Sequence, residues 1–185
     1  MLTAGVARAA SGSDRMDLKE ALTTAIHYEH QVRDHYLKAR EQVLNPQGKR
    51  VFETLAREEQ GHVEYLESRL AEWSQGGKIS SPELATELPP LEWVAEARRK
   101  VSGGPDRTVA VQEELELLKV ALELERQTSS FYRKLVDTLP EADRGMFARF
   151  LEIEAGHLAI VQAEIDSLNG MGTWFDFMEF SLEAG

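Results

Sequence analysis

Apolar residues recur every three or four positions along four long segments of the chain, and this period predicts amphipathic helices. The segments are residues 18–44, 49–74, 108–139 and 141–168. Asp17, with Glu20 three residues later, is a typical start for the first helix. No segment shows a strand pattern of comparable strength, so the sequence predicts an all-α protein. Stop signals follow the four segments in turn: Asn45-Pro46-Gln47-Gly48, Gly76-Gly77, Pro140 and Asn169-Gly170.

Residues 75–107 differ from the rest in being rich in Gly, Pro and Ser, and only residues 91–101 within them favour a short helix. A connection of this length inside a helical domain needs a structural reason. A helix of about 27 residues is about 40 Å long, and a crossover along the bundle spans that length. We therefore expect two antiparallel hairpins, residues 18–74 and 108–168, joined by a long crossover into a four-helix bundle.

This pattern predicts one domain, residues 17–168, between two tails. Residues 1–16 lack a sustained apolar stretch, so we expect a disordered tail and no secretion signal. Residues 169–185 include a dense aromatic run from Trp174 to Phe180. We expect this tail to pack on the end of the bundle or to form a subunit interface, in a homodimer or a higher homo-oligomer.

A Glu-x-x-His motif occurs twice, and a single Glu precedes each copy on the helix before it, at intervals of 30 and 29 residues. Positions i and i+3 lie on one face of a helix, so the Glu and His of each copy point the same way. All of these residues fall within the apolar stripe of their helix. Counted from the hairpin turns at about 1.5 Å per residue, they lie at similar levels. The six residues are Glu29, Glu59, His62, Glu125, Glu154 and His157.

These six residues are expected to form one layer across the middle of the bundle. The expected burial of its four carboxylates constrains what else this layer contains. Four unpaired carboxylates in an apolar core would cost many kcal/mol or stay protonated. Two divalent cations balance their formal charge, and a bundle with this duplicated motif is suited to two metal ions. We expect Glu59 and Glu154 to bridge the ions, with Glu29 and Glu125 terminal and one His on each ion. Carboxylate-rich sites suit iron, or manganese, more than zinc.

A tyrosine follows each single Glu by seven residues, on the same helix face. Tyr36 and Tyr132 are therefore either ordinary core tyrosines that need a hydroxyl partner or donors to a ligand carboxylate. Three other histidines, His27, His30 and His35, lie off the stripe or at its edge, and we expect them at the surface.

Composition excludes several classes of protein. The formal charge of −11 argues against nucleic acid or an anionic membrane as a partner. There is no cysteine, which excludes disulfides, thiolate zinc sites and iron–sulfur clusters. No stretch is long and apolar enough to span a membrane, so we expect a cytoplasmic protein.

Both hairpins resemble the ferritin-like superfamily, specifically rubrerythrin-like and bacterioferritin-like di-iron proteins. The resemblance rests on Tyr28-Glu29, the segment Leu55 to His62, Glu125 with Phe131-Tyr132, and the segment Leu151 to His157. It implies a ferritin-like bundle with metal ligands at the six residues above. Rubrerythrins have an extra Glu one turn after the third-helix ligand, where this chain has Thr128, and usually a cysteine-rich tail. The six-ligand set looks more like bacterioferritin.

These features predict a di-iron oxidoreductase that couples Fe(II) oxidation to the reduction of O2 or H2O2. Because cysteine is absent, the electrons come either from a separate donor protein, as in a peroxidase, or from successive Fe(II) ions, as in a ferroxidase. The alternatives are a non-enzymatic iron-binding or storage protein and a bundle that acts only as an interaction module.

Overall fold

The computed structural model describes residues 16–100 and 109–175, and within them it confirms an all-α fold. No strand occurs among these residues. The expected tail residues 1–15 and 176–185 lie outside the described part of the chain. The helices are α1 (Leu18–Gln42), α2 (Pro46–Gly76), α3 (Leu91–Lys100), α4 (Val109–Thr138) and α5 (Glu141–Met171).

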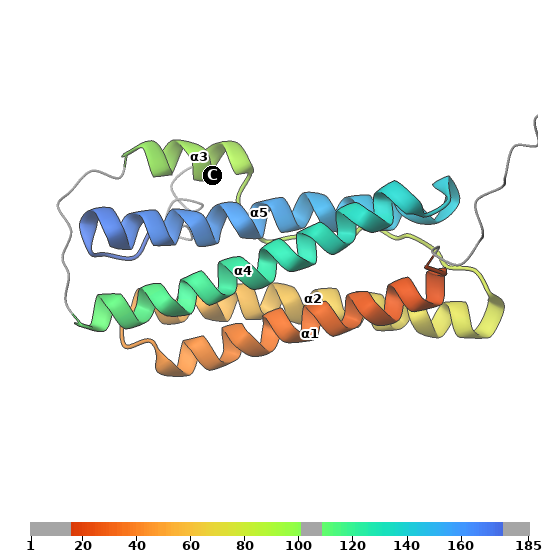
Figure 1. Ribbon diagram of the computed structural model, residues 1–185, viewed down its shortest axis with the longest axis horizontal. Helices are drawn as coiled ribbons and strands as arrows, with labels where there is room; N and C mark the ends of the chain where they lie inside the picture. The colour runs from red at the N-terminus through yellow and green to blue at the C-terminus, as the bar shows by residue number, and fades with distance from the viewer. Residues whose placement is uncertain (1–15, 101–108, 176–185) are drawn as a thin grey trace, which may run out of the picture.

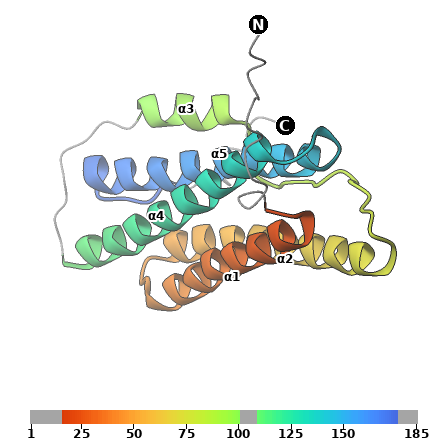
Figure 2. The same cartoon turned by 45° about the vertical axis from the view of Figure 1, so that its right-hand side comes forward.

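The four long helices form a bundle of two antiparallel hairpins, α1 with α2 and α4 with α5 (Figure 1). Helices α1 and α4 also pack together, which joins the hairpins. Helices α2 and α4 run in the same direction, because the chain returns along the whole bundle between them, as expected. Within this return, α3 lies along α5 on the outside of the bundle, which Figure 2 shows from a second direction.

The helix ends follow local capping chemistry. The Asp17 side chain accepts a hydrogen bond of 2.8 Å from the backbone N–H of Glu20, as the sequence predicted. The predicted start of the second helix was three residues late. Asn45 follows the turn after α1 and also caps α2, because its side chain accepts a hydrogen bond of 2.8 Å from the Gln47 N–H. Pro46 occupies the first turn of α2, where its missing N–H costs nothing.

The last helix also continues beyond its predicted end. Asn169 and Gly170 remain helical, and α5 ends at Gly172, which adopts a left-handed φ of 70°. Glycine reaches this conformation without steric cost, so it is the residue that stops the helix. The described part of the C-terminal tail then turns back onto the bundle, where Trp174 and Phe175 are buried.

The core consists of two apolar clusters, one toward each end of the bundle. One contains Phe52, Leu118 and Trp174, and the other contains Leu66, Phe147 and Phe150. The polar residues of the duplicated motif are buried on the same helix faces as the apolar residues of these clusters. Among the described residues, no helix has the length and apolarity needed to cross a membrane.

Candidate metal centre

The structure brings all six residues of the duplicated motif into the interior of the bundle. Each of the four long helices contributes a carboxylate, and α2 and α5 each add a histidine. None of the six residues is more than 1% exposed: they are Glu29, Glu59, His62, Glu125, Glu154 and His157. They meet because the i, i+3 spacing places each Glu-x-x-His pair on the inner face of its helix.

Two overlapping groups of potential ligand atoms lie in this layer. In one, Glu29 and His62 lie with Glu59 and Glu154; in the other, Glu125 and His157 lie with the same two glutamates. Within each group, one nitrogen or oxygen atom from every residue lies within 4.8 Å of the others. Only Glu59 and Glu154 belong to both groups, which is the arrangement expected of carboxylates that bridge two ions.

The two histidine rings stack on each other at 5.3 Å with 14° between their planes. Their Nδ1 atoms face the carboxylates. His62 Nδ1 lies 3.2 Å from both Glu29 Oε2 and Glu59 Oε2. His157 Nδ1 lies 2.7 Å from Glu59 Oε1 and 3.5 Å from Glu125 Oε1. The two oxygens of Glu59 therefore lie next to the Nδ1 atoms of both rings.

Two tyrosines complete the layer, and each links the two hairpins. The Tyr36 hydroxyl on α1 donates to Glu125 Oε1 on α4. Reciprocally, the Tyr132 hydroxyl on α4 donates to Glu29 Oε1 on α1. The sequence left the partners of these hydroxyls open, and the structure shows that both bond to carboxylates of the layer.

Burial raises the pKa of two of the carboxyls. Desolvation, followed by the charge of Glu59, raises the pKa of Glu29 to about 8. Desolvation, followed by the charges of Glu125 and Glu29, raises the pKa of Glu154 well above its usual value. Without a cation, this layer therefore takes up protons to reduce its negative charge.

The remaining shifts follow from ion pairing. Burial would lower the pKa of His62, but Glu59 and Glu29 outweigh it and raise that pKa to about 9. His157 behaves in the same way, and its pKa lies well above the usual value. Burial would raise the pKa of Glu59, but His157 and His62 hold it well below its usual range.

Several buried polar atoms of the layer have no hydrogen-bond partner among the described residues. They include both carboxylate oxygens of Glu154, Oε2 of Glu125, and Nε2 of both histidines. Buried polar groups are normally satisfied, so each such atom needs an explanation. Oxygen and imidazole nitrogen donors converging in a buried layer fit divalent iron or manganese. These buried Glu and His groups are thus compatible with metal binding.

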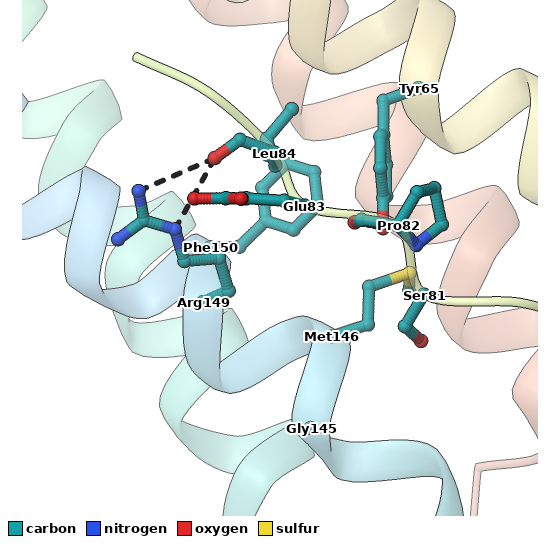
Figure 3. A pocket seen from close by; sticks show the side chains of 9 residues that line it. All are labelled: Tyr65, Ser81, Pro82, Glu83, Leu84, Gly145, Met146, Arg149 and Phe150. Carbon is teal, nitrogen blue, oxygen red and sulfur yellow. Dashed lines mark hydrogen bonds between the residues drawn. The ribbon is translucent and has the colours of Figure 1, made fainter.

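A surface pocket of about 400 Å3 lies beside this layer, between the crossover, α2 and α5 (Figure 3). Phe150 lines the pocket and also packs edge-on against the His62 ring, with centroids 5.3 Å apart. On the crossover side, Arg149 donates from Nε and Nη2 to the Leu84 carbonyl, both at 3.3 Å. Phe150 thus separates the pocket from the histidines.

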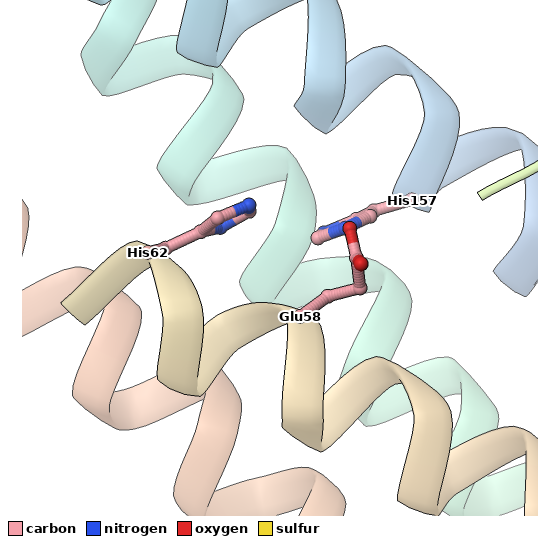
Figure 4. A group of neighbouring side chains, drawn as sticks. All are labelled: Glu58, His62 and His157. Carbon is pink, nitrogen blue, oxygen red and sulfur yellow. The ribbon is translucent and has the colours of Figure 1, made fainter. Parts of the chain in front are cut away.

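Sequence reasoning missed one acidic residue next to the layer. Glu58 is 9% exposed, and one of its carboxylate oxygens lies within 4.8 Å of a ring nitrogen of both His62 and His157 (Figure 4). Glu58 directly precedes a motif residue, but a run of glutamates on a helix usually faces water. The one signal in the sequence was that an acidic residue, Glu58, stands directly before the Glu of the first motif.

The other histidines do not enter the layer. His27 is exposed, and His30 and His35 are partly exposed. His35 Nε2 lies 2.9 Å from the Leu117 carbonyl, and burial lowers the pKa of His35 despite this bond. Thr128 is buried one turn after Glu125, and its hydroxyl donates to the Leu124 carbonyl at 3.1 Å.

The model of the ferritin-like domain matches residues 17–167, which is most of the chain and both of its hairpins. The protein therefore belongs to the ferritin-like family. No curated protein and no solved structure matches the chain.

Proposed function

We propose that this protein is a di-iron oxidoreductase that couples the oxidation of Fe(II) to the reduction of O2 or H2O2. The observation that carries this proposal is the pair of overlapping ligand groups that share Glu59 and Glu154. Among ferritin-like proteins, the ligand set is similar to those of the rubrerythrin-like and bacterioferritin-like di-iron proteins.

The proposed ligand roles follow from this sharing. Glu59 and Glu154 would hold both ions. Glu29 and His62 would complete the ligands of one ion, and Glu125 and His157 those of the other. Four carboxylates balance the charge of two divalent ions, and the protons that the ion-free layer holds on Glu29 and the imidazoles leave when ions bind.

When bound, two Fe(II) ions supply the electrons for reducing O2 or H2O2. The protein keeps the reaction away from bulk water, because Phe147 and Phe150 pack around Tyr132 next to the carboxylates. Tyr36 and Tyr132 hold Glu125 and Glu29 in place through their hydroxyl groups. The pocket behind Phe150 is the proposed approach for a small oxidant.

The origin of the electrons distinguishes two forms of this activity. The chain has no cysteine, so it cannot hold a cysteine-ligated iron centre that would pass electrons to the site. A separate electron-donor protein would give a peroxidase or oxidase cycle, whereas successive Fe(II) ions would give a ferroxidase. We propose further that the protein works in the cytoplasm as a homodimer or higher homo-oligomer.

The test is anaerobic loading with Fe(II) followed by addition of H2O2, with and without a reductant. Peroxide accepts two electrons, so one peroxide should be consumed per two Fe(II). With a reductant present, consumption should continue over many cycles. A single stoichiometric burst that never recycles would contradict catalysis. Binding of many iron atoms per chain in a large assembly would instead support a storage protein.

A further inference from the structure

Glu58 approaches the metal layer from outside, on the side covered by the crossover. Its carboxylate points toward the ring of His157, which belongs to the other hairpin (Figure 4). One carboxylate oxygen lies within 4.8 Å of a ring nitrogen of both His157 and His62, and it is the His157 ring that the carboxylate lies beside in Figure 4. Hydrogen bonds around a reactive centre are often long before ligands bind and shorten afterwards.

The crossover fixes the orientation of this carboxylate. The Thr86 hydroxyl donates to Glu58 Oε2 at 2.6 Å, and the Glu87 N–H donates to Glu58 Oε1 at 2.9 Å. The crossover is itself held against α5, since a Cβ on Gly156 would lie 3.9 Å from Leu88 Cδ1 and Arg149 bonds the Leu84 carbonyl. Glu58 therefore cannot rotate away without breaking two bonds.

Each histidine has at least one ring nitrogen that lacks a hydrogen-bond partner within the described part of the chain. Both Nδ1 atoms lie close to the inner carboxylates. Among the described residues, the buried Nε2 atoms of both rings and Nδ1 of His157 accept or donate no hydrogen bond. A histidine that binds a metal through one nitrogen normally donates the N–H of its other nitrogen to a carboxylate or carbonyl, which fixes the ring and makes it a stronger ligand.

The duplicated motif supplies this acceptor only once. Glu58 directly precedes the motif residue Glu59, and the equivalent residue before Glu154 is Ile153, which is buried and apolar. On the other side of the layer, the aromatic ring of Phe150 packs against His62. The two halves therefore differ in what surrounds their histidines.

We propose that Glu58, oriented by Thr86 and Glu87 of the crossover, is a positioning residue that accepts the outer N–H of His157 and makes the two metal positions inequivalent. The inference rests on the proposed metal centre. The position formed by Glu125 and His157 should bind a divalent ion more tightly than the position formed by Glu29 and His62. The crossover thus sets the order in which the two positions fill.

Anaerobic titration with Co(II) tests this inference without any turnover, because the visible absorption of bound Co(II) reports its ligand geometry. The wild-type protein should bind two ions in two resolved phases. Glu58→Gln should weaken the tighter phase about tenfold or more and change its absorption bands. Thr86→Val, which removes one orienting bond from an exposed position, should shift the same phase in the same direction by a smaller factor.

The matched control is Glu72→Gln. Glu72 also holds the crossover, since its Oε2 accepts from the N–H and the hydroxyl of Ser80, both at 3.0 Å, but it is not in the metal layer. Its two phases should match those of the wild type. Thermal unfolding of the ion-free variants shows that each is folded.

The outcomes separate this inference from the proposed centre. If the wild type binds no Co(II), the centre itself fails. If the wild type binds two ions but Glu58→Gln and Thr86→Val leave both phases and their absorption unchanged, only the role of Glu58 is overturned. Loss of a third bound Co(II) in Glu58→Gln would also overturn it, because Glu58 would then be a ligand of a separate ion.

Discussion

The hydroxyl of Tyr132 donates a hydrogen bond to Glu29, joining α4 of the second hairpin to α1 of the first. Tyr36 and Glu125 form the reciprocal bond in the opposite direction. Both tyrosines are fully buried, and desolvation, followed by the charge of the bonded glutamate, raises the pKa of each well above its usual value. Each tyrosine therefore remains a neutral donor at any physiological pH.

Removing either hydroxyl should weaken metal binding while leaving the fold intact. Tyr36→Phe and Tyr132→Phe each release one proposed terminal glutamate from its orienting bond, so we expect affinity for Co(II) to fall about ten- to a hundredfold. Equilibrium titration measures the change. Tyr65→Phe is the control, because within the described part of the chain its hydroxyl bonds the exposed Pro82 carbonyl and no carboxylate of the layer; an equal loss in this variant would contradict the assignment.

The stability of the ion-free protein should decrease as pH rises from 5 to 9. Glu29 has a pKa of about 8 when folded and 4.5 as a free group, so its contribution is complete below 4.5 and is lost as pH rises toward 8. His62 has a pKa of about 9 when folded and 6.5 as a free group, so its contribution to stability is likewise lost as pH rises from 6.5 to 9. Glu59 acts in the opposite direction, but only below its ordinary value of 4.5. Urea unfolding of metal-free protein at pH 5.5, 7 and 8.5 measures this slope, and higher stability at 8.5 than at 5.5 would refute it.

Metal binding at pH 7 should release protons. Glu29 and His62 both hold a proton at this pH, since their pKa values are about 8 and 9, and both must lose it to bind an ion. We therefore expect at least two protons per chain, with more from Glu154 and His157. Calorimetric titration with Co(II) in buffers of different ionisation enthalpy counts them. Binding without proton release would show that the ions bind elsewhere.

Gly48 fixes how closely the C-terminal tail packs. A Cβ at this position would lie 2.4 Å from Trp174 Cε2, and the indole of Trp174 donates to Glu114 Oε2 at 2.8 Å. Gly48→Ala should therefore destabilise the protein by about 1–3 kcal/mol through overpacking. At Gly145 a Cβ would meet nothing within 4 Å, so Gly145→Ala should stabilise α5 by about 0.5–1 kcal/mol. Chemical denaturation measures both variants, and equal effects would contradict this account of the tail.

The helical fold could be predicted from the sequence because the apolar period continues over many turns in each of the four long segments. Helix ends were harder to predict, because the same residues can stop one helix and start the next. Asn45 and Pro46 form a stop signal for α1 and are also the cap and first turn of α2. Likewise, Asn169 and Gly170 only weaken a helix, whereas Gly172 ends it in a left-handed conformation.

The layer of buried acids could be predicted because the i, i+3 spacing placed Glu59 with His62, and Glu154 with His157, on one helix face. The apolar stripes identified these faces as inner ones, and residue counts from the turns gave matching levels. Their role as metal ligands stays a prediction. The partners of Glu58 were not accessible, because Thr86 and Glu87 lie in a crossover that has no apolar period to fix its register. Contacts of that kind depend on the packed structure rather than on any local pattern.

Metal analysis of anaerobically purified protein tests the central claim most directly. Iron and manganese should be counted per chain in the wild type, in Glu59→Ala and in Glu64→Ala. Glu59 is buried with its carboxylate next to both histidines, whereas Glu64 is exposed on the same helix. Circular dichroism confirms that all three remain helical.

We predict about two ions per chain in the wild type and in Glu64→Ala, and loss of most of this metal in Glu59→Ala, because the lost carboxylate belongs to both ligand groups. A folded wild-type protein without bound metal, or a Glu59→Ala variant that retains the wild-type content, would contradict a shared two-ion centre and leave the bundle as an interaction module.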